Sequence, residues 1–244
     1  IKRIVGPYQD SYSPNGIIGE KDACGVGFIA NIKGVESNWI LKQSLKGLNC
    51  MEHRGGCGGD SDSGDGAGIL CSIPWEYLEE KMNLKNTKES NRGLGMIFMP
   101  NKKEKIEECK SICEEEAKKL RINKTSWRTV PVNNEILGPL AKANAPFISQ
   151  WILFINKKDN DDIEKILFQL RKRIEKKVRE SFKNHVGDCE FYFASLSSKT
   201  VVYKGMVRSE ILSEFYKDLK EESFKVSFSV YHRRFSTNTL PKWP

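Results

Sequence analysis

No stretch of the 244-residue sequence approaches the roughly 18 consecutive apolar residues that a membrane-spanning helix needs. Lys2 and Arg3 lie near the N-terminus, but no apolar segment follows them as it would in a signal peptide. Internal repeats and low-complexity segments are also absent. We therefore expect no membrane-spanning helix, no signal peptide at residues 1–23 and no repeat architecture, and the length allows one large domain or two small ones.

The sequence has seven cysteines, an odd number, and no paired Cys-x-x-Cys motifs. A disulfide framework is therefore not expected, and we infer a reducing intracellular compartment, the cytoplasm or a plastid. Cys109 and Cys113 lie one helical turn apart and could form half of a metal site, but the sequence offers no second half. We therefore expect no metal site and interpret both residues as part of a helix face.

Basic residues outnumber acidic ones by 40 to 32, which gives a net charge of +8 and a pI of about 9.0. Such a balance fits either binding to nucleic acid or a lysine-rich solvated exterior. The positive charge is spread along the whole chain. Its densest run, residues 171–179, is interrupted by the apolar residues Ile174 and Val178, so the basic residues are interpreted as the solvent-exposed face of a helix. We expect neither a nucleic-acid partner nor a membrane partner.

Hydrophobic periodicity predicts a mixture of strands and helices. Strands are predicted over residues 25–32, 67–72, 93–99, 125–132, 145–155 and 224–235. Helices are predicted over residues 38–53, 102–120 and 159–181, with a short helix opening at Pro74. Residues 189–195 and 200–205 are predicted to form a β-hairpin, and the near-continuous apolar run of the first strand predicts burial on both faces. The grouping of strands and of helices favours an α+β fold.

Cys24 lies at the head of the first predicted strand, in the segment Asp22-Ala23-Cys24-Gly25-Val26-Gly27-Phe28. Taken alone, it is better interpreted as a buried strand cysteine than as a nucleophile. The glycine-rich segment 55–68 lacks the Gly-Lys-Ser/Thr ending of a P-loop and the ligand spacing of a calcium loop. It fits a turn in which glycines let the backbone pack closely, which by itself is a weak signal.

Two arginines also stand at the ends of predicted elements. Arg54 follows the first helix, where it could simply cap carbonyl groups. Arg234 ends the last strand and is followed by Phe235-Ser236-Thr237-Asn238-Thr239. A guanidinium beside hydroxyl and amide groups suits the binding of a carboxylate, although an exposed structural turn explains the pattern about as well.

Together these segments resemble the N-terminal class II glutamine amidotransferase domain of the glutamate synthase family, over nearly the whole chain. Four motifs occur in that family's order: Cys24-Gly25-Val26-Gly27, His53-Arg54-Gly55, Gly64-Asp65-Gly66-Ala67-Gly68 and Arg234-Phe235-Ser236-Thr237-Asn238-Thr239. The resemblance implies a four-layer αββα N-terminal-nucleophile hydrolase fold. It also implies that residues 1–23 are a pro-segment and that residues 24–244 are the N-terminal part of the amidotransferase domain, with the fold incomplete.

The resemblance further implies that Cys24 becomes the first residue of the mature chain. A free α-amino group has a pKa of about 7.7–8.0 and can act as the base for the thiol, which an amide nitrogen cannot. The thiolate would form a thioester with glutamine and release ammonia. By the same resemblance Arg234, Phe235 and Thr237 would bind the substrate. Arg54, Asp65 and Gly66 would hold these residues in position without contacting the substrate.

The complete enzyme of this family passes ammonia from glutamine to 2-oxoglutarate. The resemblance places FMN, an iron–sulfur cluster and an NAD(P)H site in later domains, so no cofactor is expected within these residues. The family's oxyanion-hole Asn-Gly pair and the acidic residue for the substrate amino group would follow Pro244, so we expect a fragment of a longer chain whose activity alone is in doubt. Two alternatives remain open: a non-catalytic basic binding or structural module with Cys24 blocked, or another class II amidotransferase.

Overall fold

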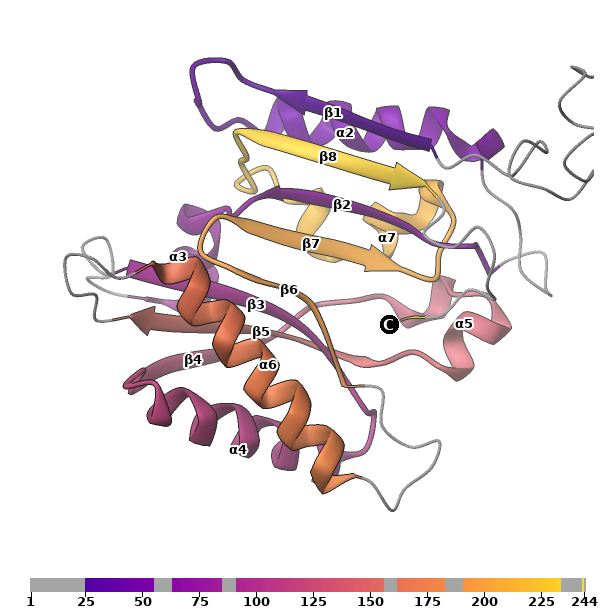
Figure 1. The fold of residues 1–244 in the computed structure, drawn as a ribbon. Helices are drawn as coiled ribbons and strands as arrows, with labels where there is room; N and C mark the ends of the chain where they lie inside the picture. Colours follow the sequence, from indigo (N-terminus) through magenta and orange to yellow (C-terminus); the bar gives the residue numbers. More distant parts are fainter. Residues whose placement is uncertain are drawn as a thin grey trace, which may run out of the picture.

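The computed structural model describes residues 25–54, 63–84, 91–155, 162–182, 191–233 and 243. They form an α+β fold with two antiparallel sheets of four strands each (Figure 1). The first sheet has the order β1-β8-β2-β7 and the second the order β4-β5-β3-β6. The α+β prediction is therefore confirmed, and both sheets carry helices.

The elements have the following bounds. The strands are β1 (Gly25–Ala30), β2 (Ala67–Ser72), β3 (Asn91–Met99), β4 (Lys124–Thr129), β5 (Phe147–Ile155), β6 (Tyr192–Ser197), β7 (Thr200–Gly205) and β8 (Phe228–Arg233). The α-helices are α2 (Asn38–Cys50), α3 (Trp75–Met82), α4 (Lys103–Lys119), α5 (Pro139–Ala143), α6 (Ile163–Ser181) and α7 (Leu212–Phe215). Short 3-10 helices are η1 (Glu52–Arg54), η2 (Asn134–Ile136), η3 (Ser209–Ile211) and η4 (Lys217–Lys220).

Both faces of the second sheet are buried, which explains why β5 is almost continuously apolar. Successive strand residues point to opposite faces. Trp151 and Leu153 therefore pack in the cluster that α4 and α6 cover, whereas Ile152 packs in a second cluster on the other face. The alternation in β3 is the same, with Ile97 toward α4 and α6 and Met96 on the opposite face.

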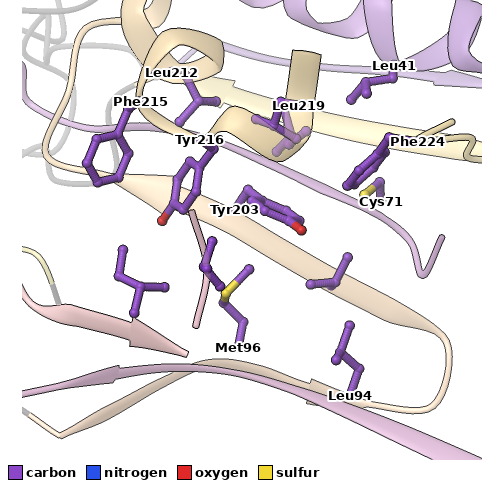
Figure 2. Close-up of a cluster of buried hydrophobic side chains, with 14 of the residues drawn as sticks. Leu41, Cys71, Leu94, Met96, Tyr203, Leu212, Phe215, Tyr216, Leu219 and Phe224 are labelled. Atoms are coloured by element: carbon purple, nitrogen blue, oxygen red, sulfur yellow. The ribbon is translucent and has the colours of Figure 1, made fainter. Parts of the chain in front are cut away.

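The second cluster joins the two sheets. Figure 2 shows Leu94 and Met96 of β3 facing Tyr203 of β7, beside aromatic side chains from the segments that follow β7. The rings of Tyr203 and Tyr216 meet edge to face, with centroids 5.0 Å apart. Aromatic pairs of this geometry add about 0.5–1.5 kcal/mol beyond the burial of their area. The hydrophobic core thus continues from one sheet to the other.

A buried ion pair lies in the same core. The Nη1 and Nη2 atoms of Arg128 in β4 each donate to one carboxylate oxygen of Asp218 in η4, both at 2.7 Å. The hydroxyls of Tyr77 and Tyr203 also donate to Asp218, at 2.8 Å and 3.1 Å. Burial acts to lower the pKa of Arg128, but the hydrogen bonds to Asp218 and its charge outweigh burial and raise it. A fully buried carboxylate is tolerated here because four donors satisfy it.

Two sequence predictions about this sheet arrangement are wrong. Strands β6 and β7 do not pair as a hairpin, because β6 pairs with β3 in the second sheet and β7 pairs with β2 in the first. The chain between them passes from one sheet to the other, and the turn signal does not distinguish these outcomes. The last strand also begins later than predicted, at Phe228, since Val226 forms only an isolated bridge to Ser37.

The prediction that the first strand is buried on both faces is also wrong. Within the described residues β1 is an edge strand of the first sheet, and Val26 and Phe28 are 66% and 76% exposed. Helix α2 packs against β1 and β8 on the other face of this sheet, and α7 lies on that same side (Figure 1). Within the described residues no layer therefore covers Val26 and Phe28 on the remaining face of the first sheet, which we call the open face.

Removal of the buried carboxylate tests the ionic link between the sheets. Asp218→Ala leaves the Arg128 charge buried without its partner, so we expect the free energy of unfolding to fall by about 3–5 kcal/mol. Glu222→Ala is the matched control, since Glu222 forms an exposed ion pair with Lys42 and its loss should cost at most about 1 kcal/mol. Urea unfolding of both variants measures the difference, and equal losses would contradict this account.

Candidate active site

One end of the first sheet brings together three of the motifs that the sequence singles out. Gly25, Arg233, Ala67 and Gly205 are cross-strand partners in a single row over β1, β8, β2 and β7. This row lies at the right-hand end of the upper sheet in Figure 1. Gly25 is joined by a peptide bond to Cys24, Arg233 to Arg234 and Ala67 to Gly66. The strand ends that carry these motifs therefore lie side by side.

The four residues predicted to contact the substrate all lie outside the described part of the chain. These are Cys24, Arg234, Phe235 and Thr237. Arg54 belongs to η1, but its side chain is not among those described. Asp65 and Gly66 are described, and they directly precede β2 at the same end of the sheet.

Arg233 is a fully buried cation in this row. Its Nη1 atom donates to the carbonyl oxygen of Gly66 at 3.0 Å, and its Nη2 atom donates to Oε1 of Glu52 at 2.9 Å. The other carboxylate oxygen of Glu52 accepts a hydrogen bond from the backbone N–H of Ser209 at 3.0 Å. One ion pair therefore connects the end of β8 with η1, with η3 and with the loop before β2.

The carboxyl group of Glu52 is ionised near neutral pH. Partial burial acts to raise its pKa, but hydrogen bonds from Ser209 and Arg233 and the charge of Arg233 outweigh burial and hold the pKa below its usual value of 4.5. Since the lowered pKa belongs to the folded state, the pair stabilises the fold above pH 4.5. The contribution is lost as the pH falls through the lowered pKa.

The loop before β2 packs closely against the backbone of neighbouring segments. The N–H of Ala141 donates to Oγ of buried Ser63 at 3.1 Å. A Cβ atom on Gly64 would lie 2.5 Å from the carbonyl carbon of Val207 and from the nitrogen of Arg208. Gly66 has φ +115°, a conformation that favours glycine. The interpretation of glycines that permit close backbone packing is therefore confirmed at Gly64 and Gly66, while residues 55–62 of the same segment lie outside the described part of the chain.

Sequence reasoning missed Arg233 and its partner Glu52. It assigned a function to Arg234 only, because two adjacent arginines look alike in a sequence. The period-two alternation of β8 is the signal that could have placed Arg233 on the buried face of the sheet. Arg233 shares a face with buried Ser229 and with Tyr231, which packs over Gly27 and Gly47.

Neither a metal-ligand cluster nor a membrane-spanning helix occurs in the described ranges. They contain no group of three or more His, Cys, Asp or Glu side chains that could hold a metal ion. They also contain no helix that is both long enough and apolar enough to cross a membrane.

Comparison with known proteins decides the family. Residues 24–244 match the family model described as glutamine amidotransferases class-II. The chain belongs to this family. The match begins at Cys24 and includes every segment that meets in the row of strand ends.

Curated relatives of this class-II amidotransferase chain are ferredoxin-dependent glutamate synthases. The chloroplastic protein of Oryza sativa subsp. japonica is 45% identical over 242 residues, which cover 98% of this chain and 15% of that protein. The chloroplastic/mitochondrial protein 1 of Arabidopsis thaliana is 46% identical, over 93% of this chain and 14% of its own length. Protein 2 of Synechocystis sp. is 45% identical, again over 93% and 14%. The chain thus spans about a seventh of the length of these relatives.

Gly64→Ala tests the packing of the loop in this amidotransferase chain. The new Cβ would overlap backbone atoms that cannot rotate away, so we expect the free energy of unfolding to fall by about 1–3 kcal/mol. Gly95→Ala is the matched control, because the atoms that its Cβ would meet are side-chain carbons no closer than 3.4 Å. If denaturant unfolding shows the same loss for both variants, close backbone contact at Gly64 is not the reason for glycine there.

Proposed function

We propose that this chain is the glutaminase part of a glutamate synthase. It hydrolyses glutamine to glutamate and ammonia, and the ammonia aminates 2-oxoglutarate elsewhere in the long protein. The observation that carries the proposal is the row of strand ends at Gly25, Arg233 and Ala67. Segments about 40 and 200 residues apart in sequence meet there, and each adjoins a motif of the class-II family.

The proposed nucleophile is Cys24, after residues 1–23 have been removed as a pro-segment. The start of the family match at residue 24 supports this boundary. The freed α-amino group takes the proton from the thiol, and the thiolate attacks the side-chain carbonyl carbon of glutamine. The protonated amino group returns this proton to the leaving nitrogen as the tetrahedral intermediate expels ammonia and leaves a thioester. The amino group then takes a proton from the attacking water and passes it to the sulfur as the second tetrahedral intermediate releases glutamate and restores the thiol.

The proposed substrate contacts come from the segment that follows β8. Arg234 pairs with the α-carboxylate of glutamine through its guanidinium fork, and Phe235 and Thr237 help to orient the substrate. Arg54, Asp65 and Gly66 support these residues. The supporting role of Gly66 rests on a contact within the described residues, because its carbonyl oxygen accepts a hydrogen bond from Arg233.

The open face of the first sheet supports the finer αββα description of the fold. On that face Val26 and Phe28 of β1 lie beside His232 and Val230 of β8, and Leu70 of β2 follows in the same register. A sheet face with exposed branched and aromatic side chains normally packs on another layer. We propose that a further sheet, distinct from the two described here and formed by another part of the long protein, covers it.

The rest of the long protein supplies the reductive chemistry in this proposal. By the resemblance to the glutamate synthase family, FMN and an iron–sulfur cluster would be bound by those parts. Three relatives are named ferredoxin-dependent, which favours reduced ferredoxin over NAD(P)H as the electron donor. The plastid names of the plant relatives and the cyanobacterial relative favour a plastid or cytoplasmic location.

Covalent labelling of the full-length mature enzyme tests the nucleophile. Diazo-oxo-norleucine, a glutamine analogue with an electrophilic carbon, should modify Cys24 and abolish glutaminase activity. Cys24→Ala should remove the labelling and lower the glutaminase rate by at least roughly 10⁴-fold, because the thioester can no longer form. Cys50→Ala, at an exposed cysteine, is the control and should retain both the labelling of Cys24 and the glutaminase rate. Undiminished labelling of the Cys24→Ala variant would refute the assignment.

Phe28→Ser tests the covering of the open face in the full-length enzyme. If a second layer buries Phe28, the substitution loses most of a buried aromatic contact and should cost about 1–3 kcal/mol. Phe168→Ser on α6, where Phe168 is 60% exposed, provides the control. Thermal unfolding should show a lower Tm for the Phe28 variant alone, whereas equal Tm values would mean that the face stays open.

A further inference from the structure

The buried charge of Arg233 needs an explanation beyond stability. Its side chain is 1% exposed, while that of its partner Glu52 is 29% exposed. A buried ion pair seldom stabilises a fold more than well-packed apolar residues would, since both ions lose their hydration. Such a pair is more informative about geometry, because its hydrogen bonds fix the groups that they join.

The neighbours of Arg233 leave room for its side chain. In the row across the first sheet its partners are Gly25 on β1 and Ala67 on β2, both buried, and Gly205 follows on β7. These residues have little or no side chain on the face that Arg233 shares. The guanidinium therefore lies among small residues at the strand ends, where it reaches acceptors from two other segments.

The acceptors of Arg233 determine which segments it holds. Nη1 is bonded to the carbonyl oxygen of Gly66 and Nη2 to Glu52, and Glu52 is bonded in turn to the N–H of Ser209. Both Nη atoms are thus occupied by protein oxygens in a site with almost no exposed surface. Arg233 is therefore placed to act on a substrate through these segments and not by contact.

We propose that Arg233 and Glu52 form a positioning pair for glutamine binding. The pair fixes the end of β8 relative to the loop that ends at Gly66 and to η1. The next residue after Arg233 is Arg234, the proposed partner of the substrate carboxylate, so the position of Arg233 sets the geometry of that contact. This inference rests on the proposed function and adds to it two residues that determine affinity for the substrate.

The test uses the full-length mature enzyme and two probes of Cys24. Diazo-oxo-norleucine reports recognition of a glutamine-like molecule through its saturation constant KI and its maximal rate kinact. Iodoacetamide reports the reactivity of the same thiol without such recognition. The variants are Glu52→Gln, which keeps the shape of the side chain, Arg233→Lys, which keeps the charge, and the double variant.

We expect Glu52→Gln and Arg233→Lys each to raise KI about 10- to 100-fold, since a small misplacement of a binding group has effects of this size. The kinact value and the iodoacetamide rate should stay within about twofold, the size of effect expected where no reacting group has moved. The double variant should be no worse than the worse single variant, as for two residues that act as a unit. Glu222→Gln removes the same charge from an exposed pair with Lys42 and should leave KI unchanged.

Failure of the inference and failure of the proposed function give different results. If the unmodified enzyme is not labelled at Cys24 by diazo-oxo-norleucine, the proposed function fails. If it is labelled and Glu52→Gln has an unchanged KI, the positioning role is overturned, whether or not the Tm falls. A loss of kinact at constant KI also overturns it. Glu52→Gln keeps the test decisive if Arg233→Lys does not fold, because Glu52 is partly exposed.

Discussion

The pairing of β8 between β1 and β2 is the constraint on which the first sheet and the candidate site depend. β8 is the last strand of the described chain, yet it forms antiparallel ladders with the first two strands. The register then places Arg233 opposite both Gly25 and Ala67. A slip of one residue would turn Arg233 to the open face and separate it from Glu52 and Gly66. The strand register and the buried ion pair therefore depend on each other.

Two arginines with little exposed side chain have separate roles in this architecture. Arg128 and Asp218 lie in the core between the sheets, where the tyrosine hydroxyls complete the set of donors around the carboxylate. Arg233 and Glu52 lie at the end of the first sheet, beside the motifs of the class-II family. In both pairs an ionic contact joins segments distant in sequence, and in both the charges are compensated by hydrogen bonds. Burial of charge here specifies geometry at some cost in hydration.

Much of the secondary structure could be predicted because the periodic signals are local. β2 has the predicted bounds, and α4 and β5 differ from prediction by one or two residues at their ends. The turn before Thr200 was recognised, but the hairpin prediction was wrong because turn residues do not specify which sheet each strand joins. The exposure of Phe28 was mispredicted for a related reason, since an apolar run shows the tendency to be buried but not what covers it.

The sequence by itself determined the family, because the order and spacing of the motifs can be read directly from it. It also determined where most strands and helices lie. It also singled out Asp65 and Gly66. The backbone conformation at position 66 favours glycine. Only the tertiary structure decided that Arg233 is buried and bonded to Glu52 and to the Gly66 carbonyl. The physical reason is that the alternation within β8 can indicate which face Arg233 shares, but its partners lie 167 and 181 residues away in the sequence. Only the register between the strands brings these segments together.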